Sequence, residues 1–314
     1  MRKIVLVLAI LGFIVNAGIA FAQEKSGGGV TISPLTFELT TNPGDTIINK
    51  IKVFNPSDSP ISVKMEAENF KPIGEEGKVV TSTEEDEDTT YSLRKWIKII
   101  PNEFILEGNG QRSVDFIIEV PQDAEPGGKY GSILAGISGS MSNEETMGAA
   151  VSTKTGSLVL LMVSGDLNEK LAISNFSAPS FQEYGPVPFE IKFENMGTVH
   201  AKPRGYIMIT DWFGNNVTEF EFSQKNVMPG AIRKIDVEWD IKWLFGKYTA
   251  SVIGVYGTSN KSITSQVITF WVLPWKLMLG ILIILLVIFI FFFKTKKRWQ
   301  LALKILFKGE HHTQ

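Results

Sequence analysis

Apolar and polar side chains alternate along most of the chain between Val30 and Val272. In residues 61–68, for example, Ile, Val, Met and Ala alternate with Ser, Lys and Glu. The same period of two runs through residues 189–194 and 235–240. A period of two is typical of strands with one buried face, and no long stretch between these limits has the period of a helix. The pattern therefore predicts an all-β fold for this part of the chain.

Short segments rich in Asn, Pro, Gly and Asp separate the predicted strands. Residues 42–45 read Asn-Pro-Gly-Asp, and the Phe-Gly-Asn-Asn of residues 213–216 predicts a hairpin turn. The run from Ser157 to Val163 is apolar at almost every position, which predicts a central strand buried on both faces. The polar segment from Gly165 to Lys170 then divides the strand pattern in two.

Three short motifs recur in the same order, which favours two related domains over chance similarity. They are Lys50-Ile-Lys-Val-Phe-Asn55 with Glu190-Ile-Lys-Phe-Glu-Asn195, Arg112-Ser-Val-Asp115 with Arg233-Lys-Ile-Asp236, and Gly128-Lys-Tyr130 with Gly246-Lys-Tyr248. We therefore expect two tandem immunoglobulin-like β-sandwiches. The first occupies residues 30–166 and carries an acidic insertion, and the second occupies residues 167–271.

An uninterrupted apolar run follows the strands. From Leu277 to Phe293 no side chain is charged or strongly polar. Its length corresponds to roughly 26 Å of helix, close to the ~30 Å hydrocarbon core of a bilayer. Trp271 and Trp275 precede the run, where amphipathic rings favour the headgroup layer. The sequence predicts one transmembrane α-helix in residues 272–293, and the alternative is a buried helix of a soluble protein.

The charges around this run predict its orientation. Lys294, Lys296, Lys297 and Arg298 follow it directly, so the positive-inside rule places the C-terminus in the cytoplasm. Residues 294–314 form a basic tail in which lysines and apolar residues fall on opposite faces of a helix. We expect a short amphipathic helix on the inner leaflet, or alternatively a docking helix for a cytoplasmic partner.

The N-terminus has the pattern of a signal peptide. Arg2 and Lys3 precede an apolar segment and then small residues, which predicts a signal peptide in residues 1–22 with cleavage between Ala22 and Gln23. An uncleaved anchor is the alternative. Residues 23–29 are polar and glycine-rich and are expected to form a flexible linker. The protein is thus expected in the plasma membrane with a single span and its N-terminal part outside.

Charge and cysteine content narrow the functional classes. The predicted ectodomain has 22 basic and 32 acidic side chains, a net charge near −10, whereas the tail is near +5. An acidic ectodomain is unsuited to nucleic acid, so no nucleic-acid partner is expected. Cysteine is absent, so the domains must be held by hydrophobic cores rather than disulfides.

Candidate catalytic and metal-binding motifs are weak. Ser92-Leu-Arg-Lys95 and Lys154-Thr-Gly156 match two of three signatures of penicillin-binding enzymes, but the third is missing and strands surround both. His200 is the one histidine of the predicted ectodomain, which leaves no triad or zinc site to propose. The acidic run Glu84 to Asp88 lacks the spacing of a calcium loop and favours a solvated loop. We predict no catalytic residues, no cofactor and no metal.

Binding is therefore expected in loops and at edges. The longest irregular segments are predicted at Lys71 to Leu93 and Ser140 to Lys154. Trp239 lies on the apolar face of its strand and is expected in the core. Trp212 and Trp243 are open to either a core or a binding role.

Taken together, these features resemble the WxL-interacting proteins of bacterial cell surfaces. Local similarity is seen in Ile32-Ser-Pro34, Val53-Phe-Asn55-Pro, Val120-Pro and the apolar run that begins at Gly156. The first domain is also similar to the immunoglobulin-like domains of pilus chaperones. The resemblance implies a non-catalytic surface protein that binds the lipid bilayer through its anchor, and peptidoglycan or exported surface proteins through its ectodomain. Alternatives are a membrane-tethered chaperone or assembly factor, or an accessory subunit of an envelope enzyme or transporter.

Overall fold

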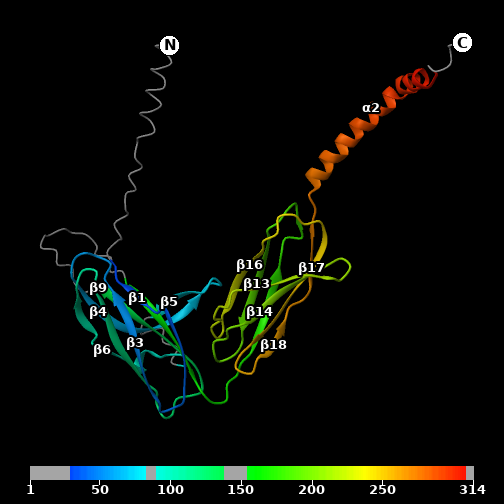
Figure 1. The fold of residues 1–314 in the computed structure, drawn as a ribbon. Coiled ribbons are helices and arrows are strands. Elements are labelled where there is room, and N and C mark those ends of the chain that lie inside the picture. Colours follow the sequence, from blue (N-terminus) through cyan, green and yellow to red (C-terminus); the bar gives the residue numbers. More distant parts are fainter. Residues whose placement is uncertain (1–28, 83–89, 138–153, 309–314) are drawn as a thin grey trace, which may run out of the picture.

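The computed structural model describes residues 29–82, 90–137 and 154–308, with side chains as far as Lys294. In this part of the chain two β-sandwiches follow one another and a single long helix leaves the second (Figure 1). Ala22, Gln23, the acidic run from Glu84 to Asp88 and most of the segment from Ser140 to Lys154 lie outside the described residues. The all-β prediction with one C-terminal helix is confirmed.

The first sandwich packs two sheets around one core. One sheet has the order β1-β3-β8-β6 and the other β2-β10-β9-β4-β5, with β7 pairing with β4. Their bounds are β1 Thr31–Ser33, β2 Thr36–Thr41, β3 Thr46–Phe54, β4 Ile61–Ile73, β5 Lys78–Ser82, β6 Ile97–Ile100, β7 Glu103–Leu106, β8 Gln111–Glu119, β9 Gly127–Ile137 and β10 Lys154–Val163. A 3-10 turn, η2 Arg94–Trp96, precedes β6. The alternating apolar residues supply the core, in which Ile51, Phe116 and Ile133 are fully buried.

The second sandwich has the same plan. One sheet has the order β11-β13-β16 and the other β12-β19-β17-β14-β15, with β18 pairing with β17. Their bounds are β11 Leu171–Ser177, β12 Phe181–Gln182, β13 Val187–Asn195, β14 Arg204–Asp211, β15 Asn216–Glu221, β16 Ile232–Trp239, β17 Gly246–Tyr256, β18 Lys261–Thr264 and β19 Ile268–Val272. Its separate core contains Phe189, Phe193 and Phe270.

The repeated motifs fall at equivalent places in the two sandwiches. In the first, Lys50 of β3 pairs with Asp115 of β8, and in the second Glu190 of β13 pairs with Asp236 of β16. The first strands of both large sheets also pair in parallel with the last ones, β2 with β10 and β12 with β19. The repeat seen in the sequence therefore corresponds to a repeat of strand order and register.

One predicted loop is largely regular structure, and that prediction was wrong in part. Residues Lys71 to Ile73 continue β4, and Lys78 to Ser82 form β5, so that a hairpin with its turn at residues 74–77 replaces the expected irregular segment. Pro72, Gly74 and Gly77 obscured the strand pattern in the sequence. Pro72 is accommodated because it pairs with Val79 near the end of a sheet rather than in its centre.

The helix α2 runs from Trp275 to Lys308. Its segment Trp275–Lys294 is apolar and long enough to cross a membrane, and none of it is buried against the sandwiches. This segment contains both predicted span ends, Leu277 and Phe293. The helix then continues without a break, where the sequence predicted a separate amphipathic helix.

Candidate functional site

The two sandwiches meet on the outer face of the β2-β10-β9-β4-β5 sheet. Phe70 of β4, Tyr130 of β9 and Leu160 of β10 are buried there with Met228, which lies in the connection before β16. The next residue, Leu161, belongs to the first core. Strand β10 is thus covered on one face by its own core and on the other by the second sandwich. This double cover accounts for its apolar sequence.

Tyr130 and His200 join the two sandwiches at the centre of the junction. The backbone N–H of His200 donates to the Tyr130 hydroxyl at 2.7 Å, and the two rings meet edge to face at 5.7 Å. Close by, the Gly128 N–H donates to the Thr198 carbonyl at 2.9 Å. Burial raises the pKa of Tyr130 well above its ordinary value and lowers the pKa of His200. Both side chains are therefore neutral at pH 7 and serve the contact between domains.

Glu38 on β2 anchors one rim of the junction. Its carboxylate accepts hydrogen bonds from the Lys202 ammonium at 2.9 Å and from the Asn226 amide at 2.7 Å. Burial alone raises the pKa of Glu38, but these hydrogen bonds and the Lys202 charge together hold it below its ordinary value. The carboxylate is thus ionised at neutral pH and bridges the first sandwich to two segments of the second.

The β4–β5 hairpin reaches across the opposite rim. The Glu75 carbonyl accepts the Lys234 N–H at 2.7 Å, and the Glu75 carboxylate pairs with Lys192 at 2.6 Å. This hydrogen bond raises the pKa of Lys192. Gly77, in the left-handed region at a φ of 75°, lies directly against the Arg233 guanidinium. The hairpin turn therefore occupies the start of the free edge of β16.

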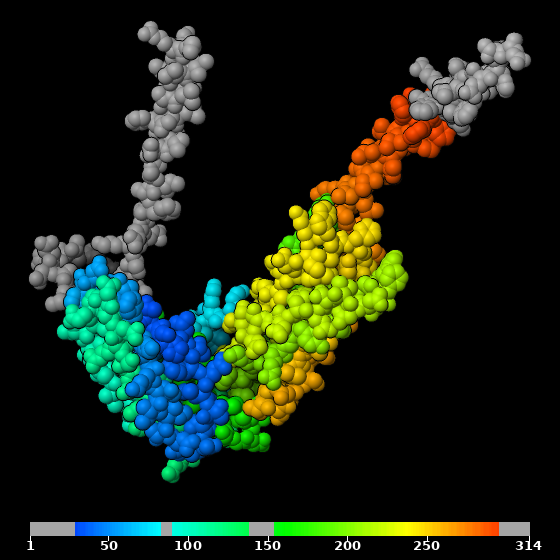
Figure 2. Space-filling model, viewed as in Figure 1, coloured from blue at the N-terminus to red at the C-terminus, as the bar shows by residue number. Residues whose placement is uncertain are grey.

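Two hollows open beside this hairpin, of about 230 Å³ and 220 Å³. Phe70, Pro72 and Met228 line both of them. The first is completed by residues such as Ser82 and Tyr91, and the second lies between the hairpin and the loop before β16. Figure 2 shows the hairpin in cyan between the blue first sandwich and the green and yellow second one. We refer to the two hollows together as the junction groove.

The residues of the weak catalytic motifs have separate structural partners. The Ser92 hydroxyl accepts a hydrogen bond from the Asn69 amide at 2.7 Å, next to the 3-10 turn. The Lys154 ammonium on β10 pairs with Glu66 at 2.8 Å and Glu68 at 3.0 Å on β4, across the intervening strand β9. The described residues contain no cluster of three or more His, Cys, Asp or Glu able to hold a metal ion.

The three tryptophans of the second sandwich separate into two groups. Trp239 is buried in the core at 4% exposure, whereas Trp212 and Trp243 are exposed at 66% and 65%. None of them lines the junction groove. Phe70 and Met228 were not predicted from the sequence as groove residues. The one signal for a contact at this place was the apolar outer face of the strand that contains Leu160.

Known proteins with a similar structure include several chaperones. No protein-family model matches the chain, and no curated protein matches it. The class 5 fimbriae chaperone CfaA is 14% identical, with a TM-score of 0.38 over 78% of this chain and 100% of that chain. The E. coli chaperone DraB is 13% identical, with a TM-score of 0.35 over 78% of this chain and 97% of that chain. The periplasmic chaperone SfaE is 14% identical, with a TM-score of 0.32 over 78% and 100%. At these identities and scores the likeness is one of fold type.

Proposed function

We propose that this chain is a membrane-anchored, non-catalytic binding protein of the bacterial cell envelope, and that its junction groove takes an extended segment of an exported protein. The observation that carries the proposal is the pair of hollows that share Phe70, Pro72 and Met228 as walls. Apolar walls with a few polar groups, placed between domains, are common features of binding sites.

The size of the hollows favours a polypeptide segment. Each hollow is smaller than the ~300–1,000 Å³ pockets that hold drug-sized ligands, so each suits one side chain. Alternate side chains on one face of an extended segment are about 7 Å apart, so two neighbouring hollows can hold two of them. The walls are aromatic, proline and methionine side chains, and methionine adapts to different apolar partners.

The edge strand β5 offers main-chain partners for the same segment. It ends its sheet, with β4 as its strand neighbour among the described residues. Its Ser82 lines one hollow and its Val79 the other. An extended segment added along β5 would gain main-chain hydrogen bonds for affinity, while the hollows select its side chains.

The apolar segment Trp275–Lys294 supports the anchor. We propose that it spans the cytoplasmic membrane with the sandwiches outside and the lysine-rich C-terminus inside, as the charge pattern predicts. Membership of the WxL-interacting family stays a prediction, and so do the signal peptide and the domain bounds 30–166 and 167–271. A wall polymer such as peptidoglycan is the rival ligand, since the same resemblance suggested it.

The test places a photocrosslinking residue, p-benzoylphenylalanine, at Tyr91 on the groove and, as a control, at the exposed Ile105 of β7. In illuminated cells we expect an adduct with an exported protein from position 91 and none from position 105. Introducing a charge through Val79→Glu should abolish the adduct, because Val79 lines the groove. The same change at Val217, which is similarly exposed on β15, should leave it intact.

Two results would count against the proposal. One is an adduct that forms equally from both positions. The other result combines two observations: no protein adduct forms from position 91, and the full chain sediments with purified cell wall equally well with and without Val79→Glu. The second result would move the assignment to a wall polymer bound elsewhere on the surface.

A further inference from the structure

The end of the second sandwich from which the helix leaves is held close to the membrane boundary. Strand β19 ends at Val272 and α2 begins at Trp275, so Leu273 and Pro274 alone separate them. The Leu273 N–H donates to the Gln182 carbonyl at 2.9 Å, and Lys276 in the first helical turn pairs with Glu183 at 2.7 Å. The start of the helix is therefore fastened to the sandwich.

The length of the span fixes where this end lies. The 20 residues of Trp275–Lys294 correspond to about 30 Å of helix, which matches the hydrocarbon thickness. Trp275 is then at the outer boundary of the hydrocarbon. Two extended residues reach about 7 Å at most, and the headgroup layer on each side is roughly 5–8 Å thick. The loops beside Val272 consequently lie at the level of the lipid headgroups.

Strand register brings two aromatic turns to the same end. Gly246 pairs with Val272, which places the β16–β17 connection beside the start of the helix. Asp211 pairs with Tyr248, which places the β14–β15 turn there as well. These segments carry four exposed aromatic side chains, which we call the aromatic rim: Trp212 at 66%, Phe213 at 75%, Trp243 at 65% and Phe245 at 64% exposure.

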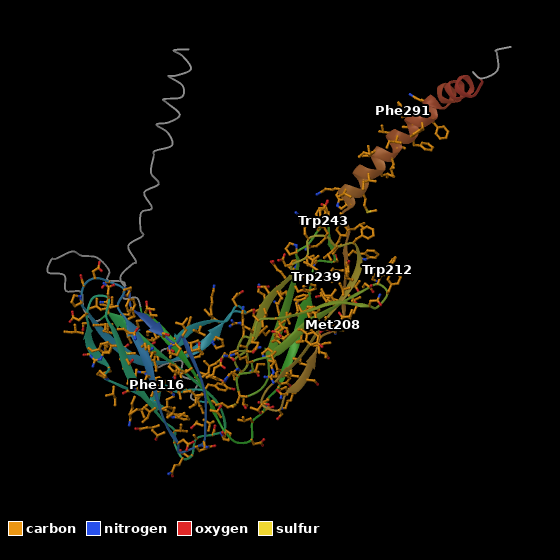
Figure 3. The ribbon with its side chains drawn as sticks, viewed as in Figure 1. Phe116, Met208, Trp212, Trp239, Trp243 and Phe291 are labelled. Carbon is orange, nitrogen blue, oxygen red and sulfur yellow. The ribbon has the colours of Figure 1, made fainter. Side chains whose placement is uncertain are left out.

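The rings of the aromatic rim have few protein contacts. Trp243 meets Tyr184 edge to face at 5.4 Å, and Trp212 meets its neighbour Phe213 at 5.1 Å. Figure 3 shows Trp243 at the base of the helix and Trp212 on the adjoining hairpin, whereas Trp239 lies within the sandwich. Rings with an apolar body and a polar N–H are favoured in the interfacial layer of a bilayer and are costly to leave in water.

We propose that the aromatic rim docks on the outer leaflet, so that the second sandwich rests on the lipid headgroups beside its own span. This inference depends on the anchoring put forward above. The charges nearby are balanced, since Glu183 pairs with Lys276, and Asp211 and Asp240 are matched by Lys242 and Lys247. Docking should therefore occur on zwitterionic phosphatidylcholine and should not require anionic lipid.

The test uses the full chain, which has no cysteine, so that a single introduced thiol carries one fluorescent label. The chain is reconstituted into phosphatidylcholine vesicles with or without brominated acyl chains, which quench a label at membrane depth. Lys242→Cys probes the aromatic rim, and Ser259→Cys, in the exposed turn between β17 and β18 at the other end of the sandwich, is the control. We expect the label at position 242 to lose most of its fluorescence and the label at 259 to keep it.

A third label, at Ile284→Cys in the span, separates the two proposals. Quenching at 284 with equal fluorescence at 242 and 259 would overturn the docking and leave the anchor standing. No quenching at 284 would overturn the anchor itself. In the Lys242→Cys chain, the further changes Trp243→Gln and Phe245→Gln should restore fluorescence, whereas Ile48→Gln, at a similarly exposed position of the first sandwich, should not. Persistent quenching after loss of both rings would also contradict the docking.

Discussion

Asn55 and Asn195 share three equivalent side-chain hydrogen bonds in the two sandwiches. Each side-chain oxygen accepts the N–H two residues on, from Ser57 at 3.0 Å and Gly197 at 2.9 Å. Each amide nitrogen donates to the carbonyl four residues on, at 2.9 Å and 2.8 Å, and to a carbonyl of a distant segment, that of Leu106 or Val227. Both side chains are almost completely buried. The last residue of the repeated motif thus fixes the same turn twice.

We expect Asn195→Ala to lower the free energy of unfolding of the second sandwich by about 2–3 kcal/mol, because buried carbonyl and N–H groups would lose their partners. Asn55→Ala should do the same to the first sandwich. Urea unfolding followed by tryptophan and circular dichroism signals measures both. Asn175→Ala on the exposed face of β11 is the control and should change stability by less than about 0.5 kcal/mol.

Stability at the junction should fall on mild acidification. Burial lowers the pKa of His200, so the unfolded chain takes up a proton near the ordinary value of 6.5 while the folded chain resists it. The stabilisation is therefore complete above pH 6.5 and is lost as the pH falls toward the lowered folded pKa. We expect the unfolding midpoint to drop between pH 7 and pH 5, and His200→Gln to flatten that drop.

A matched variant separates the contribution of the Glu38 carboxylate from that of the His200 imidazole. The pKa of Glu38 is held below its ordinary value of 4.5, so its contribution is present above pH 4.5 and is lost only below it. Glu38→Gln should thus keep the decrease in stability between pH 7 and pH 5 and reduce the further decrease expected below pH 4.5. A slope between pH 7 and pH 5 that is unchanged by His200→Gln would show that another group titrates there.

The contact between Gly77 and Arg233 should stabilise the turn of the β4–β5 hairpin. Gly77→Ala adds a Cβ in a left-handed conformation, which costs about 1–2 kcal/mol, and also displaces the guanidinium. Gly214→Ala is a close control, since its φ of 86° is similar and nothing lies within 4 Å of the added atom. We expect faster limited proteolysis of the β4–β5 hairpin in Gly77→Ala alone. Equal cleavage in both variants would mean that Arg233 does not hold the turn.

Membrane topology can be tested with protoplasts. A protease added outside should degrade residues 23–274 and leave a small protected fragment that contains Trp299, because the lysines after Phe293 hold the C-terminus inside. The mature N-terminus, read by mass spectrometry, should be Gln23. Protection of the sandwiches would contradict the surface orientation, and an N-terminus at Met1 would contradict cleavage.

The sequence allowed the strands and the repeat to be predicted because both depend on local pattern. Strand β10 illustrates the limit of this reasoning. Its apolar run predicted burial on both faces, yet the sequence could not show that the second cover comes from another sandwich. Phe70 and Met228 meet across a long separation in sequence, and each has the pattern of an ordinary core residue. The junction groove could therefore not be predicted from the sequence, because it forms only where the two sandwiches pack together.

The short connection between β19 and α2 also limits the distance between the proposed membrane anchor and the junction groove. Strand β17 runs from the membrane end of the second sandwich toward the junction, and its 11 residues span about 36 Å. The β4–β5 hairpin and the Glu38 bridge hold the first sandwich to the far end of this distance. With the anchoring proposed above, the second sandwich would hold the groove no more than about 36 Å above the lipid headgroups. We therefore expect a partner of the proposed groove to be bound within this distance of the bilayer, where an exported polypeptide first emerges from the membrane.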